Sequence, residues 1–232
     1  MTPELIVMLT HHDQTVRNAL DLFEECQDLP VNHWGFKDVG LPHDQMKALV
    51  KRMKEADKTT YLEVVSLSEE EGMAGAQLAA EAGFDILMGT VYFESIHRYL
   101  KDTPVRYYPF PGEVYSHPSI LGGTTEGIVR HAQEMEAKGV HGLDLLGYRF
   151  TGDAPRLIKE VVKGTHIPIV CAGSIDSTRR IAEVGVAGVW GFTIGSAFFE
   201  QKFIPGGSFK DNICAVTDYL AVEDRERNKW NT

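Results

Sequence analysis

Several ionisable residues interrupt short apolar runs that are typical of buried β-strands. Lys37 and Asp38 occur in GFKDVG, and Glu63 occurs in YLEVV. Asp144 occurs in GLDLLGYR. A charged side chain is costly to bury without a partner, so each of these must face another polar group or an open cavity. Burial beside other charges also shifts pKa values, which is how enzymes obtain acids and bases that work near neutral pH.

Two pairings of these residues would support proton transfer. An enzyme that moves a proton at one carbon or oxygen needs a base and an acid on either side of that atom. Lys37 with Glu63, or Asp38 with Asp144, would each supply such a catalytic pair, and the sequence leaves both open. In the non-catalytic alternative, Lys37 and Glu63 form an ion pair that only stabilises the fold. A Schiff base on Lys37, as in a class I aldolase, is a further chemical alternative.

Two Gly-Ser turns near the end of the chain predict an anion site. Residues 168–199 read PIVCAGSIDSTRRIAEVGVAGVWGFTIGSAFF, which indicates strand, turn, helix, strand and turn. Gly173-Ser174 and Gly195-Ser196 form the two turns, 22 residues apart. Glycine lets the backbone approach an anion closely, and successive N–H groups donate to phosphate oxygens. We expect these four residues to bind a phosphate group and Arg149 to clamp the anionic substrate.

Eight short apolar runs predict the strands that must position these residues. Several are continuously apolar and β-branched, as strands buried on both faces are. Helical patterns separate most of them, and one opens with the Ser68 and Glu71 spacing of a capping box. The pattern predicts an α/β chain that forms one (β/α)8 TIM barrel with eight parallel strands over residues 1–232. A doubly wound open sheet is the alternative. The expected strands are 4–10, 33–39, 59–66, 85–90, 105–110, 142–148, 168–174 and 188–194.

A barrel would gather the candidate residues at one end. The loops after strands seven and eight lie side by side at the C-terminal face, where barrel enzymes also hold their catalytic groups. Within residues 142–148, strand parity would point Asp144 and Tyr148 inward together. A short helix starting at Ser196 would aim its first N–H groups at the phosphate. The long loop 111–126 is a candidate lid.

Composition narrows the class of protein. The chain has 232 residues, 43% of them hydrophobic, and a net charge of −10 from 23 basic and 33 acidic residues. An acidic surface disfavours nucleic acid and anionic membranes as partners. The three cysteines contain no CxxC pair, which favours a reducing compartment. With no signal peptide or spanning segment expected at the N-terminus, the sequence predicts a cytoplasmic protein, and a homo-oligomer is possible.

The C-terminal segment resembles the ribulose-phosphate-binding barrels. That superfamily includes the histidine-biosynthesis isomerase and cyclase and the N-acetylmannosamine-6-phosphate epimerase. Its pattern is an apolar strand, Ala-Gly-Gly or Gly-Gly, a helix, Gly-Ala/Val, a second apolar strand and Gly-Ser/Thr-Ala. The resemblance covers about 32 residues, with Ser174 in place of the second glycine. It implies a sugar-phosphate-like substrate and isomerisation or epimerisation. The matching residues are Ala172, Gly173, Gly185, Val186, Gly195, Ser196 and Ala197.

The resemblance leaves rival functions. The glycerol-3-phosphate-responsive antiterminators resemble such a barrel and would use the same turns to sense a phosphate ester without catalysis. A sugar-phosphate lyase or aldolase is the enzymatic rival. The metal-dependent epimerases hold an Asp on strand seven, where this chain offers Ser174 and, beyond the turn, Asp176. His11 and His12 are expected on alternate faces of strand one, so we expect neither a metal nor another cofactor.

Overall fold

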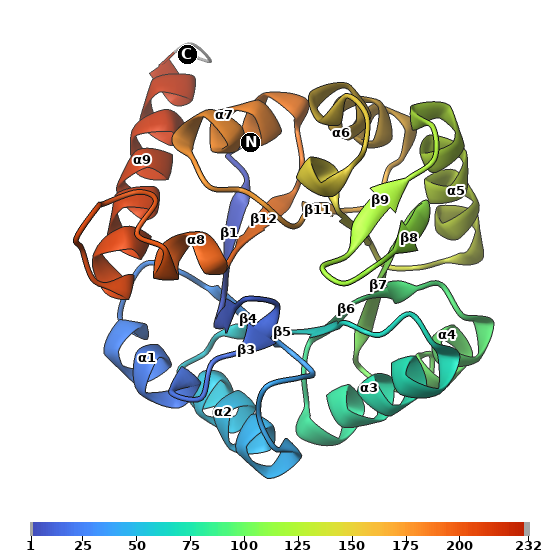
Figure 1. Ribbon diagram of the computed structural model, residues 1–232, viewed down its shortest axis with the longest axis horizontal. Coiled ribbons are helices and arrows are strands. Elements are labelled where there is room, and N and C mark those ends of the chain that lie inside the picture. Colours follow the sequence, from blue (N-terminus) through green and yellow to red (C-terminus); the bar gives the residue numbers. More distant parts are fainter. Residues whose placement is uncertain (1, 230–232) are drawn as a thin grey trace.

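Eight parallel strands among residues 2–229, the part of the chain that the structure describes, form a barrel (Figure 1). In this computed structural model the hydrogen-bonded order is β10-β11-β12-β1-β4-β5-β6-β7. At the remaining seam, the backbone N–H of His141 donates to the carbonyl oxygen of Tyr107 at 3.1 Å. The predicted (β/α)8 barrel is thereby confirmed. Its strands are β1 (Glu4–Met8), β4 (His33–Lys37), β5 (Thr59–Val64), β6 (Ile86–Val91), β7 (Arg106–Phe110), β10 (Leu143–Leu145), β11 (Ile169–Cys171) and β12 (Gly191–Ile194).

Most side chains of the strands are apolar because both faces of each strand are buried. One set of side chains packs between the sheet and the surrounding helices and forms the larger core. The alternate set fills the inside of the barrel, as strand parity requires. That interior cluster contains Ile6, Met8, Tyr61, Ile86, Met88, Tyr108 and Val170.

The helices surround the barrel in the order of the chain (Figure 1). The predicted N-cap is confirmed, because the Ser68 side chain accepts a hydrogen bond from the Glu71 N–H. The second bond of a capping box is replaced, because the Ser68 N–H donates to Ser66 Oγ. None of the helices in the described residues has the length and apolar content needed to cross a bilayer. The helices are α1 (Ala19–Cys26), α2 (His43–Glu55), α3 (Glu69–Ala82), α4 (Glu94–Leu100), α5 (Thr125–Lys138), α6 (Ala154–Gly164), α7 (Thr178–Ala187), α8 (Ser196–Phe199) and α9 (Phe209–Lys229).

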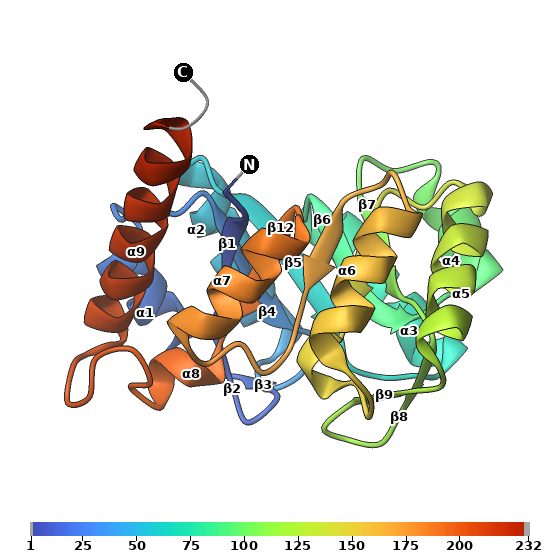
Figure 2. The ribbon, with the colours of Figure 1, turned by 90° about the horizontal axis from the view of Figure 1, so that it is seen from above.

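Two small hairpins and α8 lie at the C-terminal face of the barrel, on the side opposite both chain ends (Figure 2). The first hairpin joins β2 (Thr10–His11) to β3 (Gln14–Thr15) directly after β1. The second joins β8 (Glu113–Tyr115) to β9 (Ile120–Gly122). The second hairpin occupies most of the loop 111–126 that the sequence marks as a candidate lid. The predicted short helix at Ser196 is confirmed as α8.

The sixth barrel strand is shorter than predicted. It ends at Leu145, and a 3₁₀ helix, η1 (Gly147–Arg149), follows it. Glycine at position 147 lets this 3₁₀ helix pack against β11, because an added Cβ would lie 2.8 Å from Cys171 Sγ. The expectation that Tyr148 points into the barrel with Asp144 is therefore wrong. The Tyr148 hydroxyl instead donates to Glu183 Oε2 on α7 at 2.6 Å.

Candidate active site

A cavity of about 220 Å³ opens at the C-terminal face of the barrel. Both Gly-Ser turns line one part of it, and a cluster of ionised side chains lines another. The cavity is small beside the common range for ligand pockets, about 300–1,000 Å³, so it suits a compact ligand. The residues of these two parts of the lining are Asp13, Lys37, Glu63, Arg149, Gly173, Ser174, Gly195 and Ser196.

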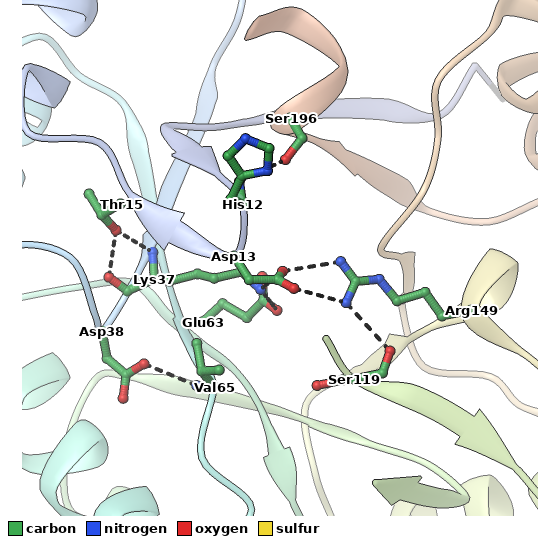
Figure 3. A network of polar contacts seen from close by, with 10 residues as sticks. All are labelled: His12, Asp13, Thr15, Lys37, Asp38, Glu63, Val65, Ser119, Arg149 and Ser196. Atoms are coloured by element: carbon green, nitrogen blue, oxygen red, sulfur yellow. Dashed lines mark hydrogen bonds and ion pairs between the residues drawn. The ribbon is translucent and has the colours of Figure 1, made fainter. Parts of the chain in front are cut away.

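Lys37 and Glu63 form the centre of the ionised cluster (Figure 3). They lie at the C-terminal ends of adjacent strands, as the last residue of β4 and the second-last residue of β5, and face each other in the β4–β5 register. Glu63 shares strand parity with Tyr61, which belongs to the barrel interior. Lys37 Nζ lies 3.0 Å from Glu63 Oε1, and both side chains are buried. The structure thus brings together one of the two pairs considered from the sequence.

Asp13 joins this cluster, although the sequence analysis did not select it. His12 and Asp13 have φ values of 50° and 59°, and they form the two-residue turn of the β2–β3 hairpin, where positive φ is favoured. The turn carries Asp13 back over the barrel, so that Lys37 Nζ donates to its Oδ1 at 2.8 Å. The Thr15 hydroxyl fixes the hairpin to β4 by bonding both the N–H and the carbonyl of Lys37. The sequence does carry a signal that could have identified Asp13: it is an acidic residue in a tight turn directly after the first strand.

Arg149 closes the cluster from the opposite side of the mouth. Its guanidinium donates to both carboxylate oxygens of Asp13, at 3.1 and 3.4 Å. It also donates to the carbonyl of Ser119 in the β8–β9 hairpin at 3.4 Å. The Arg149 side chain lies over Gly173, where an added Cβ would be 2.7 Å from its Nε. Gly173 therefore leaves room for Arg149 beside the first Gly-Ser turn.

The ion pairs determine the charge state of the cluster. Burial disfavours the ammonium form of Lys37, but Glu63 and Asp13 outweigh burial and raise the pKa of Lys37. Burial also disfavours charge on Asp13, but Lys37 and then Arg149 outweigh it and lower the pKa of Asp13 to about 2. At neutral pH Lys37 is therefore a protonated acid, and Asp13 is a carboxylate with little basicity.

The low pKa of Asp13 predicts a loss of stability in acid. Because its pKa is about 2 in the folded chain against an ordinary 3.8, the ionised carboxylate contributes about 2 kcal/mol to the free energy of unfolding above pH 4. That contribution disappears as the pH falls from about 4 to about 2. Urea unfolding of wild type and Asp13→Asn should differ by a constant amount above pH 5. A difference that does not shrink below pH 3 would contradict this account.

Asp144 lies behind the cluster, inside the barrel. It is fully buried, and neither carboxylate oxygen has a hydrogen-bond partner among the described residues. Burial raises the pKa of Asp144 well above its ordinary value, and the nearby charge of Glu63 raises it further. The surroundings of Asp144 therefore favour its protonated form. With Asp144 neutral, Asp13 and Glu63 balance the charges of Lys37 and Arg149.

A raised pKa at Asp144 predicts that Asp144→Asn stabilises the chain at neutral pH. The folded chain keeps the Asp144 proton above pH 3.8 whereas the unfolded chain releases it, so this group lowers stability as the pH rises. Asparagine has nearly the same shape and no such proton. The melting temperature of Asp144→Asn should exceed that of wild type at pH 7. Below pH 3.8 this difference should disappear, because Asp144 is then protonated in both the folded and the unfolded chain. Equal gains at both pH values would contradict a protonated Asp144.

Asp38 lies apart from the other predicted catalytic residues. It follows β4, where its Oδ1 accepts a hydrogen bond from the Val65 N–H at 3.0 Å (Figure 3). Asp38 is not among the residues that line the cavity. Burial raises the pKa of Asp38 to about 6, and the Val65 N–H opposes this rise. The structure therefore does not bring Asp38 together with Asp144, and a role for Asp38 stays a prediction.

The two predicted phosphate turns meet at the cavity. Gly173 and Ser174 follow β11 with φ values of 78° and 60°, a left-handed pair that can turn consecutive N–H groups toward one point. Gly195 and Ser196 follow β12, and an added Cβ on Gly195 would lie 2.8 Å from the Thr10 carbonyl oxygen. Glycine is needed at positions 173 and 195 because Arg149 and the Thr10 carbonyl leave no room for a Cβ atom. Phosphate binding by the turns stays a prediction.

Several solved structures resemble this barrel. Orotidine 5′-phosphate decarboxylase from Pyrococcus horikoshii OT3 matches with a TM-score of 0.68 and 12% identity over 94% of this chain and 99% of that chain. The N-acetylmannosamine-6-phosphate 2-epimerase from Clostridium perfringens matches with a TM-score of 0.59 and 12% identity, covering 84% and 86%. A glycerol uptake operon antiterminator regulatory protein from Listeria monocytogenes matches with a TM-score of 0.57 and 16% identity, covering 84% and 93%.

This chain shares the (β/α)8 barrel fold of these three proteins. Two of the three similar structures, the epimerase and the antiterminator, are kinds of protein that the C-terminal segment resembles. At 12–16% identity the likeness shows the fold alone, because barrels of this kind support many chemistries. No protein-family model and no curated protein sequence matches the chain.

Proposed function

We propose that this barrel binds a phosphorylated, sugar-phosphate-like molecule and isomerises or epimerises it by proton transfer. One observation carries the proposal: a single small cavity is lined both by the two Gly-Ser turns and by the ion-paired Lys37 and Glu63. The turns would bind the phosphate through backbone N–H groups. Binding at that end would hold the rest of the ligand against the acid and base.

Within the cluster, Glu63 is the better base and Lys37 the acid. Asp13 is held by Lys37 and by Arg149, and its low pKa makes it a weak base. Glu63 is ion-paired to Lys37 alone among the described residues. Glu63 would accept a proton from carbon, and the Lys37 ammonium would donate to, or stabilise, the oxygen that gains charge. These side chains suffice for the proton transfer without a metal ion at the reacting carbon.

Arg149 and Asp144 would support this reaction in different ways. Arg149 reaches both the cavity and the first Gly-Ser turn, so it suits the clamp on an anionic substrate that the sequence suggested. Asp144 is fully buried, so it would act from behind Glu63 as a neutral neighbour that leaves the charge of Glu63 intact.

The proposal is tested first by ligand binding. A thermal-shift screen against phosphorylated trioses, pentoses and amino sugars, with inorganic phosphate as the control, should give a stabilising ligand. A ligand at 100 times its Kd stabilises the folded chain by about 2.7 kcal/mol, which is readily visible as a raised melting temperature. A hit should then exchange a carbon-bound proton with deuterated solvent. A screen in which no phosphate ester stabilises the chain would overturn the proposal.

Two rival functions make different predictions. An aldolase needs a neutral Lys37 amine, but the two carboxylates hold Lys37 protonated; borohydride should therefore not trap a carbonyl substrate on Lys37. A sensor that acts on RNA, like the antiterminators in the sequence resemblance, needs a basic surface. The net charge of −10 and the lack of a basic cluster beyond KRMK (51–54) disfavour it. Salt-dependent RNA binding would favour the sensor.

A further inference from the structure

Two histidines and a glutamate meet at the rim of the cavity, outside the proton-transfer groups. His11 ends β2, His12 begins the hairpin turn, and Glu200 follows α8. Consecutive strand residues would face opposite ways, but the φ of 50° at His12 turns the chain. The two imidazole rings are therefore stacked, with their centroids 3.8 Å apart. The expectation of alternate faces for these histidines is wrong for this reason.

The ligand atoms of these side chains are close enough to share one cation. One nitrogen or oxygen of each lies within 4.8 Å of the others. His11 Nε2 is 3.9 Å from Glu200 Oε1. Bonds of about 2.1 Å at tetrahedral angles place ligand atoms about 3.4 Å apart, so side-chain rotations that shorten these separations by up to about 1.4 Å would suffice.

The surroundings of His11 Nε2 add a further observation. His11 Nε2 is buried, and it has no hydrogen-bond partner among the described residues. Buried polar atoms in folded proteins are normally paired with protein, water or an ion. Phe199 stacks on the His11 ring at a centroid distance of 5.2 Å and holds it in place. The nitrogen that lacks a partner is the one that faces Glu200.

We propose that His11, His12 and Glu200 bind one divalent transition-metal ion, with water at its open position. Two imidazoles and one carboxylate are a ligand set that Zn²⁺ accepts in three-ligand sites. Imidazole also suits Co²⁺ and Ni²⁺, whereas Mg²⁺ and Ca²⁺ prefer oxygen ligands alone. Lys202 Nζ pairs with the other oxygen of Glu200, Oε2, at 3.4 Å, which leaves Oε1 available to the ion.

The ion would lie beside the second Gly-Ser turn. The His12 N–H donates to Ser196 Oγ at 3.3 Å, and Glu200 lines the cavity. None of the three ligands is ion-paired to Lys37 or Glu63. The metal site is therefore separate from the acid and base, and it does not depend on the proposed proton transfer.

Calorimetric titration of the full chain with Zn²⁺ alone, in phosphate-free buffer, tests the site. We expect one ion per chain, with His12→Asn and Glu200→Gln each weakening the affinity at least tenfold. Both side chains are exposed, so the variants should fold normally, which circular dichroism checks. His117→Asn removes an exposed histidine elsewhere at the mouth, and Cys214→Ser removes the partly exposed thiol. Both control variants should bind as wild type does.

The outcomes separate this site from adventitious binding. Wild-type titration without saturable binding would overturn the proposal. So would His12→Asn and Glu200→Gln variants that bind Zn²⁺ as tightly as wild type. A loss confined to His117→Asn or Cys214→Ser would place the ion elsewhere and would also overturn it. Because no sugar phosphate is present, failure here leaves the proposed isomerase function untouched, and failure of the ligand screen leaves the metal site untouched.

Discussion

Replacing Glu63 with glutamine should lower the rate of proton exchange on the substrate by about 10²–10⁴-fold, the contribution of a well-placed general base. Glutamine keeps the size of the side chain but cannot accept the proton. The measurement is solvent-deuterium incorporation into the ligand found by the thermal-shift screen, followed by NMR. Ligand-induced stabilisation should change little, because the phosphate end of the cavity is untouched.

A control variant that removes a different carboxylate distinguishes the loss of the base from a general loss of negative charge. Glu126→Gln removes an exposed carboxylate that pairs with Arg156 at 2.6 Å on the outer surface. This variant should retain the wild-type exchange rate. If Glu63→Gln also retained the wild-type rate, Glu63 would not be the base, and the Lys37–Glu63 pair would be a structural ion pair.

Replacing Ser196 with aspartate should weaken binding of the phosphate ester by about 100-fold or more. Ser196 begins α8 and lines the cavity beside Gly195. A carboxylate about 4 Å from a bound phosphate costs about 4 kcal/mol at an effective dielectric constant near 20. Aspartate suits the first turn of a helix, so the unliganded chain should remain stable. The measurement is the ligand-induced rise in melting temperature.

Ser177→Asp is the control for this prediction. Ser177 precedes α7 as its N-cap, carries no capping hydrogen bond and lies outside the cavity lining. The same charge is therefore added at a comparable helix start. Ligand-induced stabilisation should persist in Ser177→Asp and disappear in Ser196→Asp. Equal stabilisation in both variants would mean that the second Gly-Ser turn serves only as a turn in the chain.

Local sequence patterns predicted the barrel and the end of it at which the polar residues lie. Continuous apolar runs and helical spacing are local patterns. Each strand and each Gly-Ser turn can therefore be recognised from the residues of its own segment. Lys37 and Glu63 lie at the C-terminal ends of consecutive strands of a parallel barrel, so their adjacency follows from the fold class. For the same reason, the four turn residues were expected side by side, and they line one cavity.

The carboxylates that surround Lys37 could not be predicted from these local patterns. Asp13 reaches Lys37 because two left-handed residues reverse the chain at a hairpin, and the sequence does not display backbone angles. Asp38 instead accepts a hydrogen bond from the Val65 N–H, directly after the neighbouring strand β5. Asp144 lies deep in the barrel with both oxygens unpaired, a state that depends on burial by many distant residues. Pairing and burial are set by contacts between remote segments, whereas strand and turn patterns are local.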